Sequence, residues 1–150
     1  MDFHLEGKLA LVSGSTKGIG LAIATGLARE GARVIVNGRK QASVDEALAK
    51  LRAQVPGANA EGFAGDLSDA SQIDALIAHY PAVDVLVNNL GIFDPKPFEE
   101  IPDDEWLRFF DTNVMSGVRL ARAYLPKMKA KNWAVWFSSA AKAAFKFPSR

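Results

Sequence analysis

Short apolar runs alternate with amphipathic stretches along this chain. The runs are nearly continuous, as expected of parallel strands that are covered on both faces. They are Leu9–Val12, Val34–Val36 and Val83–Val87. Two stretches between them, Leu21–Glu30 and Val44–Val55, carry apolar residues at helical spacing. The alternation predicts strand–helix–strand units with right-handed crossovers, which build an open, doubly wound α/β sheet.

Two more strands and a capped helix extend this pattern. A strand at Ala60–Ala64 precedes a helix that runs to His79, and either Ser68 or Asp69 can cap that helix. The last strand is expected near Ala134–Phe137. No repeat or linker divides the chain, so we expect a single domain with the strand order 3-2-1-4-5.

A long helix is predicted after a proline-containing loop, Ile92–Pro102. The three acids that follow the loop suit a helix N-terminus, because the helix dipole is positive there. The helix is expected to cover Asp103–Lys129. Pro126 lies in its last turns, so we expect a break or kink near Leu125.

Composition narrows the class of protein. The chain has 150 residues, 49% of them hydrophobic, which is enough for one domain with a sizeable core. A charged fraction of 23% and a net charge of +1 argue against disorder, nucleic-acid binding and an anionic membrane surface. The lack of cysteine excludes disulfides and fits a reducing compartment. With no signal-peptide profile and no apolar run near the ~20 residues that span a bilayer, we expect a cytoplasmic protein.

Three glycines follow the first predicted strand and open the next helix. Gly14 lets the chain turn tightly, and Gly18 and Gly20 let the backbone approach a pyrophosphate with no Cβ in the way. The helix N-terminus offers free N–H groups and a positive dipole to phosphate. The spacing Gly-x-x-x-Gly-x-Gly is neither the usual dinucleotide fingerprint nor a P-loop. By itself it also fits a turn that binds nothing.

The end of the second strand selects between dinucleotides. An NAD site usually has a carboxylate there for the adenosine 2′-OH, whereas the 2′-phosphate of NADP requires a cation. This chain has Arg39 and Lys40 at that place with no acid, and Lys17 within the glycine turn. These cations favour NADP(H) over NAD(H), because a guanidinium can pair with phosphate and stack near adenine. The alternative is that Arg39 and Lys40 only solvate a loop.

Three polar motifs follow the glycine turn in a recognisable order: Asn88-Asn89-Leu90-Gly91, Asn113 and Ser138-Ser139. Together with the turn, they resemble the classical short-chain dehydrogenase/reductase family. The resemblance implies a Rossmann-type dinucleotide-binding domain over residues 1–150 that lacks the C-terminal strands of the fold. The implied catalytic residues are Asn113 and Ser139. The implied cofactor-binding residues are Gly14, Ser15, Thr16, Lys17, Gly18, Ile19, Gly20, Arg39, Asp66, Leu67, Asn89 and Gly91.

The resemblance also implies individual roles. Asp66 would hydrogen-bond the adenine ring, although it also fits a simple turn or cap. Asn113 would hold a water in a proton relay, although a lone Asn in a helix more often bonds locally or faces solvent. Ser139 would orient the substrate oxygen, although it also fits a polar strand end. Leu90 departs from the family's Asn-Asn-Ala-Gly pattern and is expected to narrow the nicotinamide end of the site.

The family's proton donor, a Tyr followed four residues later by a Lys, is not found in these residues. Four residues after Tyr80 and Tyr124 stand Asp84 and Met128. A Tyr of ordinary pKa, about 10, requires a nearby Lys to lower it for catalysis at neutral pH. We therefore expect a truncated chain that does not turn over. No grouping of histidines and acids indicates a metal site either.

Three interpretations remain open. The first is an oxidoreductase that interconverts carbonyls and secondary alcohols, with small ketones or 3-oxoacyl thioesters as substrates, present as a truncated or frame-disrupted chain. The atypical stretches after Trp133, including Lys142–Pro148, support it. The second is a non-catalytic NADP(H)-binding or regulatory module. The third is a structural protein with a vestigial site.

The open edge of the predicted sheet has a consequence of its own. Without further strands, the last strand would expose Trp136 and Phe137 at an unpaired edge, which is a template for pairing with another chain. We expect self-association through this edge and the long helix, and no nucleic-acid or membrane partner.

Overall fold

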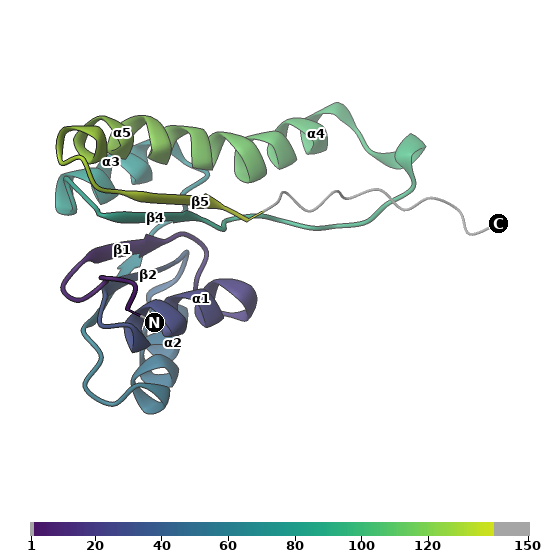
Figure 1. The fold of residues 1–150 in the computed structure, drawn as a ribbon. Coiled ribbons are helices and arrows are strands. Elements are labelled where there is room, and N and C mark those ends of the chain that lie inside the picture. The colour runs from purple at the N-terminus through teal and green to yellow at the C-terminus, as the bar shows by residue number, and fades with distance from the viewer. Residues whose placement is uncertain (1, 140–150) are drawn as a thin grey trace.

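The strands form one parallel sheet, as the sequence predicts. The computed structural model describes residues 2–139, so the atypical stretch Lys142–Pro148 lies outside the described residues. The sheet order β3-β2-β1-β4-β5 confirms the predicted order and fold class (Figure 1). The strands are β1 (Leu9–Val12), β2 (Arg33–Gly38), β3 (Ala60–Ala64), β4 (Val85–Asn88) and β5 (Val135–Ser138).

Helices cover both faces of this sheet (Figure 1). One face carries α1 (Gly18–Arg29) and α2 (Gln41–Gln54), and the other carries α3 (Ala70–His79) and α5 (Ser116–Ala130). A further helix, α4 (Asp103–Phe110), leads into α5 and extends beyond the ends of the strands. The short 3₁₀ turn η1 (Phe98–Glu100) lies in the loop before α4.

Successive residues of the strands pack into two separate hydrophobic cores, one on each face of the sheet. Ala10 and Val12 of β1 pack with the α1 and α2 side, whereas Leu11 packs with the α3 and α5 side. All three are fully buried. Because both faces are covered, the central strands read as continuous apolar runs, and this is why the sequence located them.

Asp69 caps α3. Its Oδ1 accepts hydrogen bonds from the Ser71 amide and the Ser71 hydroxyl, both at 2.8 Å. These bonds lower the pKa of Asp69 because they favour the ionised form. Of the two predicted candidates, Ser68 and Asp69, the cap is therefore Asp69.

The long helix differs from its prediction in two respects. It is interrupted by η2 (Asp111–Met115), a π-helical segment between α4 and α5. The expected break near Leu125 is wrong, because α5 continues through Pro126 to Ala130. Tyr124, two residues before Pro126, is fully buried, and its hydroxyl donates to the carbonyl of Tyr80 at 2.8 Å. This packing holds the proline-containing turn in helical form.

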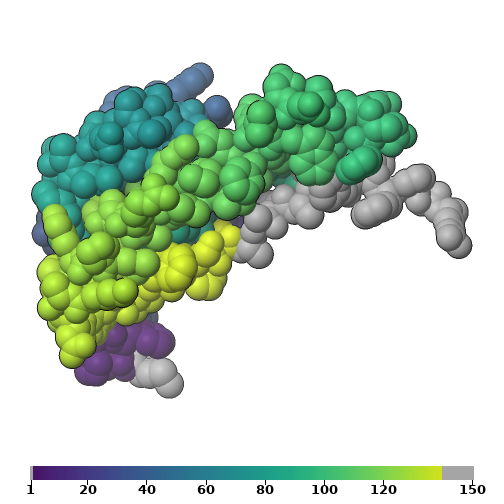
Figure 2. Space-filling view, turned by 90° about the horizontal axis from the view of Figure 1, so that it is seen from above, coloured from purple at the N-terminus to yellow at the C-terminus, as the bar shows by residue number. Residues whose placement is uncertain are grey.

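The outer edge of β5 is exposed. Figure 2 shows β5 alongside the long helix on the surface of the molecule. Val135, Trp136 and Phe137 are 44%, 54% and 53% exposed. Among the described residues, β5 pairs only with β4.

Candidate functional site

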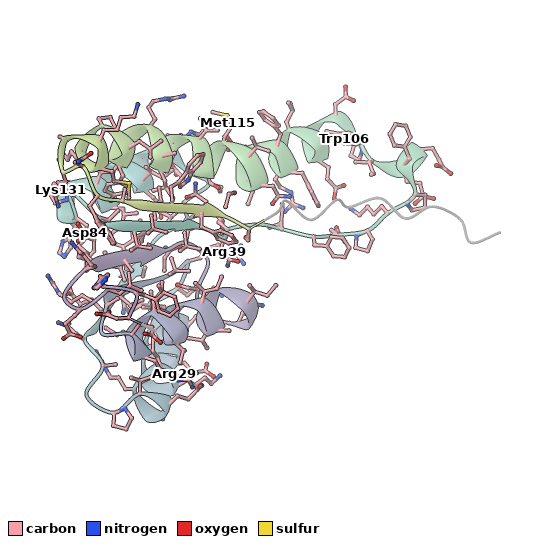
Figure 3. The ribbon with its side chains drawn as sticks, viewed as in Figure 1. Arg29, Arg39, Asp84, Trp106, Met115 and Lys131 are labelled. Carbon is pink, nitrogen blue, oxygen red and sulfur yellow. The ribbon has the colours of Figure 1, made fainter. Side chains whose placement is uncertain are left out.

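The predicted site residues gather at one end of the sheet. Parallel strands bring their carboxyl ends to the same edge, where open α/β sheets bind ligands. Figure 3 shows Arg39 at this end and Asp84 and Lys131 at the opposite end. The glycine turn follows β1, Asp66 follows β3, and Ser139 follows β5. The fold thus brings together segments that are far apart in the chain.

The glycine turn requires glycine for two different reasons. Gly14 and Gly18 have φ values of +60° and +57°, a left-handed conformation that side chains disfavour. A Cβ on Gly20 would collide with the carbonyl oxygen of Gly14 and lie 2.5 Å from Asn89 Nδ2. Gly18 faces open space instead. Gly20 therefore permits close packing within the protein, whereas Gly14 and Gly18 permit the left-handed turn.

Asn37, near the end of β2, holds the glycine turn through its side chain, and this role was not predicted from the sequence. Its Oδ1 accepts from the Gly14 amide at 3.0 Å, and its Nδ2 donates to the carbonyls of Phe63 and Gly65 at 3.2 and 3.1 Å. It is 1% exposed. One amide side chain thus joins the ends of β1, β2 and β3. An apolar run that ends in Asn was the only sequence signal.

Ser15 also supports the turn from within. Its hydroxyl donates to the Val12 carbonyl at 2.7 Å and accepts from the Asn37 amide at 2.9 Å, and its own amide donates to the Asn37 carbonyl at 2.8 Å. Ser15 is fully buried. Its hydroxyl and its amide are therefore both bonded within the protein. Thr16 packs against Gly38, and Lys17 and Ile19 are exposed beside the first turn of α1.

The loop after β3 is ordered by the Asp66 carboxylate. Oδ1 of Asp66 accepts from the Ser68 amide at 3.0 Å and the Ser68 hydroxyl at 2.7 Å. This is the turn role that the sequence left open for Asp66. Within the part of the chain that the structure describes, Oδ2 has no hydrogen-bond donor, so it remains available to a ligand. Leu67 as a whole residue is 1% exposed, and its side chain belongs to the α3 and α5 core.

The segment after β4 is tied directly to the glycine turn. Ser13 Oγ accepts from the amides of Asn89 and Leu90, both at 3.0 Å. Asn89 Nδ2 donates to the Gly14 carbonyl at 3.0 Å. The side chain of Leu90, the residue that departs from the family pattern, lies against Gly14 and also borders the α3 and α5 core.

Both candidate catalytic residues contact this same segment. Asn113 Oδ1 accepts from the Ile92 amide at 2.7 Å, and Asn113 Nδ2 donates to the Ile92 carbonyl at 3.1 Å. Ser139 Oγ lies 3.3 Å from the Asn88 carbonyl and 3.2 Å from Asn89 Oδ1. The Asn113 amide therefore bonds outside its own helix, to the backbone of Ile92.

The π-helical segment η2 places Asn113, and the sequence analysis missed it as well. A π turn inserts one residue into the α-helical ladder and frees a carbonyl. Within this part of the helix Ser116 Oγ donates to the Thr112 carbonyl at 2.6 Å. Nothing in residue propensity marks such a segment, so the sequence predicted no interruption at Asp111–Met115.

The residues present fit a dinucleotide. Gly18, Ile19 and Gly20 form the first turn of α1, whose amides lack partners within the helix and suit a pyrophosphate. Asp66 Oδ2 suits a ring amine, and the exposed Lys17 and Arg39 suit a phosphate. In residues 2–139 no cluster of His, Cys, Asp or Glu could hold a metal ion. No helix in that range is long and apolar enough to cross a membrane.

Comparisons with known proteins agree with this description. A family model described as short chain dehydrogenase matches residues 8–145. The uncharacterized oxidoreductase YvaG of Bacillus subtilis (strain 168) is 52% identical over 131 residues, which are 87% of this chain and 50% of that protein. The chain spans about half the length of the curated relatives it matches.

Two solved structures show the same fold. L-Sorbose reductase from Gluconobacter frateurii, complexed with NADPH and L-sorbose, has a TM-score of 0.83 and 32% identity, covering 92% of this chain and 54% of that one. A 3-oxoacyl (acyl-carrier-protein) reductase from Agrobacterium tumefaciens C58 with NADP bound has a TM-score of 0.79 and 36% identity, covering 89% and 52%.

Proposed function

Because this chain belongs to the short chain dehydrogenase family of oxidoreductases, we propose that it binds NADP(H) for the interconversion of a carbonyl and a secondary alcohol. The observation that carries the proposal is the convergence of the glycine turn, Asp66 and the Asn89 segment at the carboxyl edge of the sheet. The dinucleotide, when bound, supplies or accepts the hydride. The residues described here bind it and orient the reacting groups.

The proposed binding residues divide by the part of the dinucleotide that they meet. The amides of Gly18, Ile19 and Gly20 bind the pyrophosphate. Asp66 and the Leu67 backbone bind adenine. Asn89 and Gly91, which border the glycine turn and Asn113, bind the ribose beside the nicotinamide.

Lys17 and Arg39 support a preference for NADP(H) over NAD(H). Arg39 directly follows β2, where a carboxylate would otherwise meet the 2′-OH. In the described part of the chain neither Lys17 nor Arg39 pairs with an acid, so both charges are available to the 2′-phosphate. The two solved relatives, one complexed with NADPH and one with NADP bound, support this preference.

Ser139 and Asn113 are the proposed catalytic residues. The Ser139 hydroxyl can rotate from Asn89 Oδ1 toward a substrate oxygen and donate to it. Asn113 holds the Ile92 segment through both atoms of its amide and takes the relay role that the family resemblance implies. Small ketones and 3-oxoacyl thioesters are the substrate class we propose.

We further propose that a polypeptide of residues 1–150 alone binds the dinucleotide without turning over. The Tyr124 hydroxyl is bonded to the Tyr80 carbonyl, and the Tyr80 hydroxyl donates to Glu61 at 3.0 Å. Burial raises the pKa of each Tyr to about 12. Neither Tyr can therefore donate a proton at the carboxyl ends of the strands, where the candidate site lies. The same observation favours the second candidate, a non-catalytic NADP(H)-binding or regulatory module.

Self-association is also part of the proposal. Leu107, Phe110, Val114 and Val118 form an exposed apolar stripe along α4, η2 and α5, and they are 68%, 55%, 37% and 40% exposed. The open β5 edge adds Trp136 and Phe137. Apolar surface of this kind, next to an unpaired strand, favours association of copies of the chain.

A fluorescence titration of residues 1–150 with NADPH and with NADH tests the cofactor proposal. We expect saturable binding of both, with NADPH tighter by roughly tenfold or more, as one charge-assisted contact supplies. Arg39→Ala should remove most of the preference. Arg29→Ala, an exposed cation at the end of α1, removes the same charge away from the site and should not change it (Figure 3). If neither dinucleotide binds, the site is vestigial.

A further inference from the structure

Arg119 on α5 joins two parts of the site that are distant in the chain. Its Nη1 donates to the Ser68 carbonyl at 3.0 Å, and its Nη2 donates to Asp111 Oδ1 at 2.8 Å. Its side chain is 24% exposed. One guanidinium group thus contacts the loop after β3 and the beginning of η2 at the same time.

Each of the two Arg119 contacts connects to a residue of the proposed site, one to Asp66 and the other to Asn113. Ser68 is the residue whose amide and hydroxyl both bond to Asp66 Oδ1, so its backbone belongs to the Asp66 turn. Asp111 is the first residue of η2, the segment that contains Asn113. Asn113 in turn holds both the amide and the carbonyl of Ile92. A continuous series of hydrogen bonds and backbone therefore runs from Asp66 to Ile92 through Arg119.

We propose that Arg119 is a positioning residue that couples occupancy of the Asp66 loop to the geometry of the Asn113–Ile92 pair. The inference rests on the proposed function, since Asp66 is assigned there to the adenine ring. A ligand that orders the Asp66 loop fixes the Ser68 carbonyl, which fixes the guanidinium and, through it, Asp111. The catalytic end is thus set by binding at the adenine end.

The geometry suits positioning better than stabilisation. An ion pair with a carboxylate that is 44% exposed contributes little to the stability of a fold. A guanidinium is planar and presents its donors in a fixed fork, so it can hold two acceptors in a defined relation, whereas the point charge of a Lys cannot. Asp111, the residue that the guanidinium holds, is the first residue of a π-helical segment, a feature that is frequent at functional sites.

The test uses 2′,5′-ADP, which is the adenosine half of NADP, with amide-resolved NMR spectra of the full 150-residue chain. This probe cannot reach the nicotinamide end directly. In the native chain, saturating 2′,5′-ADP should shift the signals of Asp66 and Gly18. It should also shift the Asn113 side-chain amide and slow exchange of the Ile92 amide by roughly fivefold or more, an ordinary size for coupling between sites.

Two Arg119 variants separate coupling from folding. Arg119→Met should abolish the response at Ile92 and Asn113 while the direct shifts at Gly18 and Asp66 persist. Arg119→Lys keeps the charge and should also lose most of the response, because a flexible ammonium lacks the planar fork that fixes the two acceptors relative to each other. Arg122→Met is the matched control: Arg122 is exposed on the same helix, with no hydrogen bond or ion pair to any residue in 2–139, and its loss should leave the response unchanged.

The outcomes are distinguishable. Shifts at Gly18 and Asp66 with no response at Ile92 in the native chain overturn the coupling and leave the proposed function standing. An undiminished response at Ile92 in both Arg119 variants shows that Arg119 forms only a surface ion pair. No shift at any of these positions overturns the proposed function and the coupling together.

Discussion

The two edges of the sheet are built differently, although both are strands of similar length with one neighbour each. At the β3 edge, Gly62 lies under Val44 and Leu48 of α2, and Phe63 packs toward the core on the other face. Glu61 is held there by Arg33 and by the Tyr80 hydroxyl. At the β5 edge all four residues are exposed, two of them large aromatics. Strand pairing alone therefore does not bury a strand. In β3 only Ala60 is buried, with Gly62 and Ala64 exposed, and in β5 no residue is buried.

The largest expected contrast is in stability. Leu51 on α2 is fully buried in the core that covers the β3 side, and Leu51→Ala should lower the free energy of unfolding by about 2–5 kcal/mol. Trp136→Ala on β5 removes a larger side chain but should change it by no more than about 0.5 kcal/mol, because that side chain is 54% exposed. Urea unfolding measures both. Comparable losses would show that β5 is buried in solution.

An intermediate effect is expected on association. Trp136→Lys places a charge on the β5 edge, which natural sheets use to prevent pairing with another chain. We expect it to weaken self-association several-fold while the free energy of unfolding changes by no more than about 0.5 kcal/mol. Phe3→Lys is the control, since Phe3 is equally exposed, at 54%, and lies outside the sheet. Sedimentation velocity measures the self-association of each variant. An equal effect of the two substitutions would contradict a specific role for the β5 edge.

The smallest effect concerns pH at the β3 edge. The hydrogen bond from Arg33, followed by that from Tyr80, lowers the pKa of Glu61 from its ordinary value of 4.5. The stabilisation is therefore present above pH 4.5 and is lost as pH falls through the lower folded-state value. It should amount to about 0.5 kcal/mol or less, because the pair is partly exposed. Glu61→Gln should flatten the stability profile below pH 4.5, and an unchanged profile would assign the acid sensitivity to other groups.

Much of the fold could be predicted because local patterns and packing agree. The strand at Ala60–Ala64 has the predicted bounds, and Asp69 was one of two predicted caps. The role of Asn37 could not be predicted, because it depends on contacts with residues 23 to 28 positions away. The π segment at Asp111–Met115 leaves no mark in propensity, and the continuation of α5 through Pro126 depends on the burial of residues around it.

The candidate site shows the same division. The positions of the glycine turn, Asp66 and Asn113 could be read from motif order, and the structure brings their segments to one edge of the sheet. Which of their atoms are free could not be read in this way, because the Ser15 hydroxyl and amide are bonded inside the protein and only the amide of Gly20, not its Cα, has room for a ligand. Motif order indicates which segments meet, and packing decides which atoms are free for a ligand.

A map of NMR shifts on addition of NADPH tests the central claim most directly. We expect the largest shifts at Gly18, Ile19 and Gly20, with further shifts at Asp66 and Gly91. We expect none at Asp84 or Lys131, at the opposite end of the sheet (Figure 3). Shifts that gather at that opposite end, or no saturable shift at all, would contradict the assignment of the carboxyl edge as a dinucleotide site.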